Sequence, residues 1–386
     1  MLLKRFKNSY LSYFLMYNFY YLSWALFSAF ISVYLLDKGF KPSEVSLVVS
    51  TSFLTSMIAQ PFIGMISDKY SAKKINMILF VLTAIGGLYF AFASSLFTII
   101  VGYSFVLTLI NGTNPVMEKI ATASPYRYGK IRIWGTIGYA MGSQIAGLIY
   151  DYISPQAIFF AFIMTMILTI IGTYGTDSDL SLKEEKKEKV PLSTLFKNKK
   201  YLYFLLISAI FYSATMMSHT YIPAMFINDG MEVGFASTLL SIAVVCETPL
   251  VLFSHKFMDK VSNKKLLLIA YFMVCIQFAV YGFDLCLPLK VLVTFIAKHP
   301  AGMLFIMINL KVVHTIVDEN QIITALSFVA TIKNLASIIS QNIAGTLLDV
   351  TTYNSVFFIF FIVLMIGFVL TLLFKVEDGN DQKLFS

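Results

Sequence analysis

The chain has 386 residues, of which 58% are hydrophobic and 13% are charged, and its formal net charge is +8. Soluble domains carry about 25% charged residues, so a water-soluble fold could not bury this much apolar surface. The composition argues against soluble enzymes, nucleic-acid-binding proteins and secreted disulfide scaffolds, and it indicates that a lipid bilayer surrounds most of the chain. The three cysteines show neither a metal-binding spacing nor the even count of a disulfide framework.

Apolar runs long enough to cross a bilayer recur along the chain. A membrane-spanning helix needs about 20 mostly apolar residues. Six such runs precede a charged stretch between Thr176 and Lys200, and six follow it. The predicted spans cover residues 10–36, 43–66, 75–94, 97–121, 131–151, 155–174, 201–226, 233–255, 265–285, 289–313, 323–347 and 354–374. The runs are continuous rather than alternating, which favours helices over a membrane barrel of strands.

Lysine and arginine in the connections predict the orientation of these spans. If the N-terminus is cytoplasmic, most basic residues of the connections fall on the cytoplasmic side, and only Lys38, Lys41 and Lys290 fall outside. This asymmetry follows the positive-inside rule, and it predicts a multi-pass protein of the plasma membrane with both termini in the cytoplasm. The net charge of +8 is then mostly a topology signal.

Short segments of the first half recur in the second half. The segment Asp68–Lys74 matches Asp259–Lys265 at an offset of 191, and Gly39 matches Gly230 at the same offset. The segment Ile145–Asp151 matches Ile343–Asp349 at an offset of 198. These ordered matches predict a parallel duplication of six spans. The predicted domains are an N-terminal bundle (1–175), a cytoplasmic linker (176–200), a C-terminal bundle (201–375) and a cytoplasmic tail (376–386).

The loop after the second span carries Gly64, then Asp68-Lys69, then Lys73-Lys74. With the duplication, this loop resembles that of the major facilitator superfamily. The resemblance implies an all-α membrane protein with twelve transmembrane helices in two pseudo-symmetric six-helix bundles, a central cavity and alternating access. It also implies that the two matching loops act as a conformational latch between states. The latch residues would be Gly64, Asp68, Lys69, Asp259 and Lys260.

The start of the fifth span, Tyr128–Tyr139, reads YGKIRIWGTIGY. It resembles the signature of the branch that holds lactose, sucrose and raffinose permeases, nucleoside–proton symporters and a phenylpropionate permease. The resemblance implies that Arg132 contacts the solute and that Tyr139 stacks on it. The sugar-binding carboxylate of the lactose permease falls on Asn114, which argues against galactoside specificity, and Glu118 matches a second acidic position.

Ionisable residues inside spans are costly, about 2.5–3.5 kcal/mol at a helix centre, and are therefore functional candidates. Asn111, Asn114 and Glu118 share one face of the fourth span, which Pro115 interrupts. Glu118 and Arg132 both lie toward the cytoplasmic ends of their spans and could pair. Two interpretations stay open for this pair: a charge pair whose protonation couples to solute binding, or an interfacial salt bridge.

The second half carries its own ionisable residues. Glu247 lies in the middle of the eighth span, and a carboxyl removed from water is suited to loading and releasing a proton. Glu247 therefore either couples transport to protons or is paired with a lysine from a neighbouring span. The predicted solute-binding residues of this half are His219, Lys298, His299, Lys333 and Gln341. A lysine as deep as Lys333 either pairs with Glu247 or meets an anionic group of the solute.

The first span carries an aromatic stripe. Tyr17, Tyr20, Tyr21 and Trp24 recur at helical spacing, next to Asn18, and aromatic faces with polar tips suit stacking on a sugar or nucleobase. We interpret these residues as lining the solute cavity.

The sequence as a whole predicts a transporter rather than an enzyme. The predicted activity is proton-coupled uptake of a small polar solute such as an oligosaccharide or nucleoside, with the proton gradient as energy source, no cofactor and no metal. The expected partners are the solute, protons and the lipid bilayer, with no nucleic acid, and the expected state is a monomer. Three alternatives stay open: an exporter of amphipathic drugs or lipids, a carrier of an organic anion, and a non-transporting membrane sensor on a transporter fold.

Overall fold

Every regular element that the computed structural model describes is a helix. Ten helical stretches of the described chain are long and apolar enough to cross a membrane. Helices also occupy the two remaining predicted spans, α7 (Tyr128–Tyr152) and α17 (Ile322–Leu348), although both carry more polar side chains. The all-helical membrane fold is therefore confirmed. The described residues are 6–69, 71–122, 124–176, 193–258, 260–318 and 321–376.

The chain divides into two compact units. Unit 1 holds Met1–Lys183 and Thr220–Val245, and unit 2 holds Glu184–His219 and Cys246–Ser386. The predicted domain boundaries stay a prediction, and much of the predicted linker, residues 177–192, lies outside the described residues.

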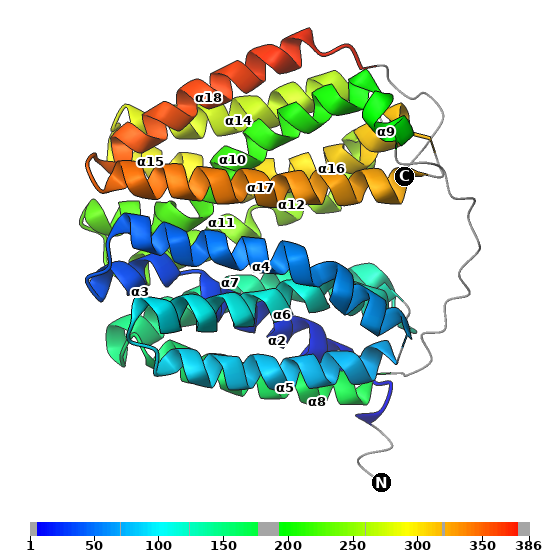
Figure 1. Ribbon diagram of the computed structural model, residues 1–386, viewed down its shortest axis with the longest axis vertical. Coiled ribbons are helices and arrows are strands. Elements are labelled where there is room, and N and C mark those ends of the chain that lie inside the picture. The colour runs from blue at the N-terminus through cyan, green and yellow to red at the C-terminus, as the bar shows by residue number, and fades with distance from the viewer. Residues whose placement is uncertain are drawn as a thin grey trace. The chain divides into compact units, whose positions relative to one another are not determined.

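The helices of unit 1 cover the first six predicted spans and the first part of the eighth. They are α2 (Tyr10–Ser28), α3 (Ile31–Asp37), α4 (Pro42–Lys69), α5 (Ala72–Ala91), α6 (Leu96–Thr122), α7, α8 (Ala157–Gly175) and α11 (Val233–Val245). Helix α2 packs against α7 and α8, α4 packs against α6, and α5 runs beside α8 (Figure 1). The last turns of α10 (Lys199–Asn228), from Thr220 onward, also belong to this unit.

Unit 2 takes the first part of α10 and most of the remaining helices. They are α9 (Ser193–Lys197), α12 (Thr248–Leu252), α13 (Ser254–Phe257), α14 (Asn263–Gly282), α15 (Leu287–Val293), the π-helix η1 (Thr294–Lys298), α16 (His299–Ile316), α17 and α18 (Tyr353–Leu373). Helix α14 packs against α16 and α18, and α17 packs against α16 and α18. In Figure 1 the long helices of this unit run side by side from green to red.

Side-chain caps fix where several helices begin. The Oγ of Ser9 accepts from the backbone N–H of Ser12 at the start of α2, and Ser262 caps α14 in the same way. Thr352 does so for α18. A hydroxyl at this position satisfies one of the backbone donors that the first turn of a helix leaves without a partner.

The repeated glycines identified in the sequence end their helices alike. Gly39 and Gly230 both adopt a left-handed backbone, with φ of +87° and +91°. After Gly39 the N–H of Phe40 donates to the carbonyl of Leu35, and after Gly230 the N–H of Met231 donates to Phe226. Each turn thus closes in the same Schellman-like pattern, for which glycine carries no steric penalty. The structure supports the duplication at this point of the two halves.

Glycines bring α2 and α7 into close contact. A Cβ at Gly138 would collide with the backbone carbonyl of Asn18, and a Cβ at Gly142 would collide with that of Leu22. Small residues four apart let helix backbones approach in a membrane, where close packing replaces the hydrophobic effect as the main attraction between helices. This contact places the first turns of α7 beside the aromatic stripe of α2.

Three predicted spans are interrupted. The first breaks at Ala29–Phe30 between α2 and α3, and the eighth breaks at Cys246–Glu247 between α11 and α12. The tenth widens into the π-helix η1 just before His299 and Pro300. The physical reason at η1 is that proline lacks the N–H that would continue the α-helical ladder, and π-turns often mark functional positions.

Candidate functional site

The first group of ionisable side chains, cluster 1, surrounds Glu118 in unit 1. The Oε1 of Glu118 accepts hydrogen bonds from the hydroxyls of Tyr17 at 2.6 Å and Tyr21 at 3.0 Å. The Nε of Arg132 lies 4.0 Å from the same oxygen, and its guanidinium lies 5.6 Å from the centre of the Tyr21 ring. Three helices, α2, α6 and α7, thus converge on one carboxylate. The predicted Glu118–Arg132 pairing is confirmed.

Cluster 1 balances its charge and stays partly open. One arginine faces one glutamate, and their side chains are 31% and 30% exposed. An ion pair that is neither fully buried nor fully solvated can break and re-form at moderate cost, because water replaces part of what each partner loses. The geometry therefore allows either side chain to take another polar partner.

The amides of α6 extend cluster 1. The Nδ2 of Asn114 donates to the Tyr21 hydroxyl at 3.4 Å, so Asn114 joins the cluster directly. Asn111 instead donates to the Oγ of Ser56 on α4 at 3.0 Å, and it lies about two helical turns from Glu118 along α6. Of these two predicted solute-binding residues, Asn114 lies within the cluster and Asn111 links α6 to α4.

The aromatic stripe of α2 divides into two parts. Tyr17, Tyr21 and Trp24 follow one another, with ring centroids 5.1 Å apart for the first pair and 5.9 Å for the second. Tyr20 is fully buried, and its hydroxyl donates to the carbonyl of Ile110. Tyr21 and Trp24 are half-buried and stack at 22°, so they are the members of the stripe that present ring faces.

Two further predicted residues lie on the α2–α7 contact. Asn18 is 2% exposed, and its Oδ1 has no hydrogen-bond partner in the described structure. Tyr139 is half-buried on α7, two turns beyond Arg132. Because Asn18 packs its backbone against Gly138, its position depends on the close approach of α2 and α7.

The second group of ionisable side chains, cluster 2, lies in unit 2. The Nδ1 of His299 is 4.0 Å from the Oε2 of Glu247, and its Nε2 is 3.3 Å from the Nζ of Lys298. The rings of His299 and His219 meet edge to face with centroids 5.4 Å apart. His299 therefore bridges a carboxylate and an ammonium, and both His299 and Glu247 are nearly buried, at 12% and 13% exposed.

Lys333 occupies the other end of cluster 2. Its Nζ lies 5.7 Å from the centre of the Tyr212 ring, and Tyr212 accepts a hydrogen bond from the Nδ2 of Asn309. Two turns along the same face of α17, Gln341 is fully buried and donates to the carbonyl of Met216 at 2.9 Å. Gln341 thus fixes α17 against α10 and holds Lys333 beside Tyr212.

Tyr212 and His219 share one face of α10, so the contacts of Lys333 with Tyr212 and of His299 with His219 place both lysines in one cluster. Lys298 is 7% exposed and Lys333 is half-buried. Among the described residues, no carboxylate lies within ion-pair distance of Lys298 or Lys333.

The residues of cluster 2 lie where the helices are irregular. Glu247 is the N-cap of the short helix α12, directly after the break that ends α11. Lys298 ends η1, and His299 begins α16. Broken helices inside membrane proteins leave backbone groups free to meet ligands, and they occur where a cavity or a site is lined.

The predicted latch loops are only partly described. Gly64 lies within α4, and nothing within 4 Å would oppose a Cβ there. The backbones of Asp68 and Lys69 end α4, while Asp259 lies outside the described residues. Lys260 lies in the turn before α14 and is exposed. The latch role stays a prediction.

Lys311 lies in the last turns of α16, where a lysine side chain often extends toward the membrane surface. Here it is held inside the protein instead. It is 8% exposed, and its Nζ donates to the carbonyls of Met258 at 2.6 Å and Val261 at 2.7 Å. The side chain therefore binds the turn between α13 and α14.

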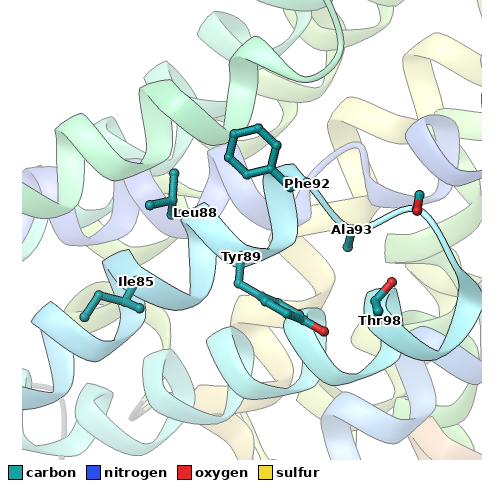
Figure 2. Close-up of a pocket in the computed structure, with 7 residues that line it drawn as sticks. Ile85, Leu88, Tyr89, Phe92, Ala93 and Thr98 are labelled. Atoms are coloured by element: carbon teal, nitrogen blue, oxygen red, sulfur yellow. The ribbon is translucent and has the colours of Figure 1, made fainter.

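The described surface also has a pocket of about 430 Å³ between α5 and α6. Figure 2 shows Ile85, Leu88 and Tyr89 on α5, Phe92 directly after the end of α5, and Thr98 in the first turn of α6. None of its lining residues is a carboxylate, histidine, lysine or arginine. It therefore offers neither proton chemistry nor charge recognition, unlike clusters 1 and 2.

Comparison with known proteins identifies the family. The model of the MFS_1 like family matches residues 10–320. The chain belongs to this family of major facilitator transporters. A maltose permease of Geobacillus stearothermophilus is 23% identical, covering 95% of each chain. A probable 3-phenylpropionic acid transporter of Escherichia coli is also 23% identical, covering 74% of this chain and 79% of the relative.

The fold has a solved counterpart. A crystal structure of a mutant of the nucleoside transporter NupG matches with a TM-score of 0.84 at 17% identity, covering 95% of this chain and 99% of that chain. The similarity establishes the major facilitator fold. The relatives are permeases for several kinds of small solute, which agrees with a transporter and not with an enzyme.

Sequence reasoning missed part of cluster 2. Tyr212 and Asn309 were not among the candidates, although they stand beside Lys333. Tyr212 and His219 are seven residues apart and therefore share a face of α10, which is a signal that the sequence contains. Asn309 follows His299 by almost three turns of α16, so the two are also on neighbouring faces.

Proposed function

We propose that this transporter imports a small polar solute, such as an oligosaccharide or nucleoside, together with protons. Twelve transmembrane helices in two six-helix bundles alternate access to the solute, in the plasma membrane with both termini cytoplasmic. The protein acts as a monomer, needs no cofactor and takes its energy from the proton gradient. The observation that carries the proposal is the nearly buried Glu247, which faces His299 at a helix break inside a membrane span.

Glu247 is better suited than Glu118 to carry the proton, because the two carboxylates have different neighbours. Arg132 is a permanent cation, so protonation of Glu118 would leave the guanidinium without its counter-ion. Protonation of Glu247 leaves a histidine, which can itself be neutral. The carboxyl of Glu247 can therefore take up or release a proton while the neighbouring His299 adjusts its own charge.

Cluster 1 then serves the solute. Arg132 and Asn114 offer hydrogen-bond donors, and Tyr21 and Trp24 offer ring faces to a sugar or a base. Solute hydroxyls compete for the same carboxylate that the tyrosine hydroxyls bind. Binding thus replaces hydrogen bonds that the empty site already makes, and this keeps the exchange of partners nearly balanced in free energy.

The test uses purified protein in proteoliposomes with an imposed inward proton gradient. The solutes are sucrose, maltose, uridine and 3-phenylpropionate, each radiolabelled. Wild-type protein should accumulate at least one of them above its external concentration. Glu247→Gln should lose gradient-driven accumulation and keep solute exchange, because only the proton step is removed. Glu232→Gln, an exposed glutamate before α11, is the matched control and should behave as wild type.

The outcomes separate the rival functions. Uphill accumulation that persists in Glu247→Gln would contradict the role of this carboxyl. Gradient-driven release of amphipathic compounds in place of uptake would favour an exporter. Absence of flux for every solute, with binding retained, would favour a sensor on a transporter fold.

A further inference from the structure

Cluster 2 carries more positive than negative charge. Cluster 2 holds two lysines, Lys298 and Lys333, and one described carboxylate, Glu247, so one positive charge is in excess when both lysines are charged and both histidines are neutral. An uncompensated charge removed from water is strongly unfavourable, and proteins normally pair it. A cluster held in this state inside a membrane protein is complementary to an anion.

The two lysines are not equivalent. The Nζ of Lys298 contacts the ring of His299, and that ring contacts the carboxylate of Glu247. The imidazole therefore links the positive charge of Lys298 to a negative charge. Lys333 has no such chain: its described contact is the face of Tyr212 at 5.7 Å. A tyrosine ring attracts a cation more weakly than a carboxylate does in the same surroundings.

Lys333 is also held in place and reachable. Gln341 anchors α17 to α10, and Asn309 donates a hydrogen bond to the Tyr212 hydroxyl. These two contacts fix the helix that carries Lys333 and the ring that it packs against. Its side chain is half-buried rather than enclosed. Preorganised donors that do not need to give up an existing ion pair are the kind that discriminate strongly for a charged ligand.

From this geometry we infer that the transported solute carries a carboxylate, bound by Lys333 with Lys298 as the second cation. The inference rests on the proposed transport function and narrows its substrate class to organic acids. The carboxylate supplies the negative charge that the described cluster lacks. Tyr212 and His219, on the same face of α10, then flank the bound group.

The experiment compares acids with neutral partners of the same shape. The probes are 3-phenylpropionate with 3-phenylpropionamide, glucuronate with glucose, and orotate with uracil. Binding to wild-type protein in detergent is measured by thermal shift, and transport by proton-driven uptake. At least one acid should bind about 10-fold to 100-fold more tightly than its neutral partner, the range expected for a hydrogen bond to a charged group.

Variants assign the difference to Lys333. Lys333→Met should remove the preference for the acid, and Lys333→Arg should restore part of it. Lys256→Met, which removes an exposed lysine of the same unit, should leave the preference unchanged. These controls separate a local contact from a general effect of net charge.

Each result decides the matter. Equal affinity for an acid and its neutral partner, or an acid preference that survives Lys333→Met, would overturn the inference. Uptake of glucose or uracil with no binding of any acid would overturn it while leaving the proposed function intact. Failure of wild-type protein to move any solute would instead refute the proposed function, and the inference with it.

Discussion

Clusters 1 and 2 place ionisable side chains inside membrane helices, but they balance charge differently. Cluster 1 pairs one arginine with one glutamate and surrounds the carboxylate with two tyrosine hydroxyls. Cluster 2 sets two lysines against one glutamate, with histidines between them. The first arrangement pairs each charge with an opposite one, whereas the second has more lysines than described carboxylates. The comparison teaches that a charged ligand would have to displace a partner in cluster 1, whereas an anion would add the missing negative charge in cluster 2.

The largest expected effect tests what holds cluster 1 together. Gly138→Val should separate α2 from α7, because the new side chain would collide with the backbone of Asn18 rather than with a side chain that can move. Overpacking of this kind costs about 3 kcal/mol or more. Thermal unfolding in detergent should show a large fall in Tm.

Gly302→Ala provides the control on α16, where nothing within 4 Å would oppose the added methyl group. This variant should match wild type or be slightly more stable, since alanine favours a helix by about 1 kcal/mol. A similar Tm for Gly138→Val and wild type would show that the α2–α7 contact does not position cluster 1.

The next effect tests the charge balance of cluster 1. Arg132→Met should destabilise the protein by about 1–2 kcal/mol, reduced from a buried pair because both side chains are partly exposed. The double variant Arg132→Met with Glu118→Gln should be more stable than Arg132→Met alone, since no carboxylate is left unpaired. Additive losses, measured as Tm in a double-mutant cycle, would mean that the two charges do not depend on each other.

A smaller effect tests the hydroxyl hydrogen bonds. Tyr17→Phe removes the 2.6 Å hydrogen bond to Glu118 and should cost about 1–2 kcal/mol. Tyr34→Phe is the matched control, because the buried Tyr34 hydroxyl has no hydrogen-bond partner in the described structure. That control should be neutral or slightly stabilising. Equal Tm values for the two variants would remove Tyr17 from the account of cluster 1.

The smallest effect has the opposite sign. Lys333→Met should raise stability by about 0.5–1 kcal/mol without solute, because it removes a half-buried charge that lacks a counter-ion. Lys311→Met should lower Tm instead, since the Lys311 ammonium binds two carbonyls. A fall in Tm for Lys333→Met would indicate that cluster 2 is already balanced and would weaken the contrast between the units.

The sequence predicted the helices well because apolar length is a strong signal, and the boundaries agree within a few residues. It also predicted the Glu118–Arg132 pair, since both residues lie near the same connection. The break at Glu247 and the π-turn before His299 were not predicted. The apolar pattern of a span continues on both sides of one irregular turn, so the sequence does not reveal it. The spatial link between Lys333 and Tyr212 joins residues 121 positions apart, which only tertiary packing decides.

Solute-driven proton movement tests the central claim most directly. Proteoliposomes containing a pH-sensitive dye are given each probe solute without an imposed gradient, and the internal pH is followed. The account predicts that the transported solute acidifies the interior in wild-type protein and does not do so in Glu247→Gln. Solute entry without any change of internal pH in wild-type protein would contradict proton-coupled transport.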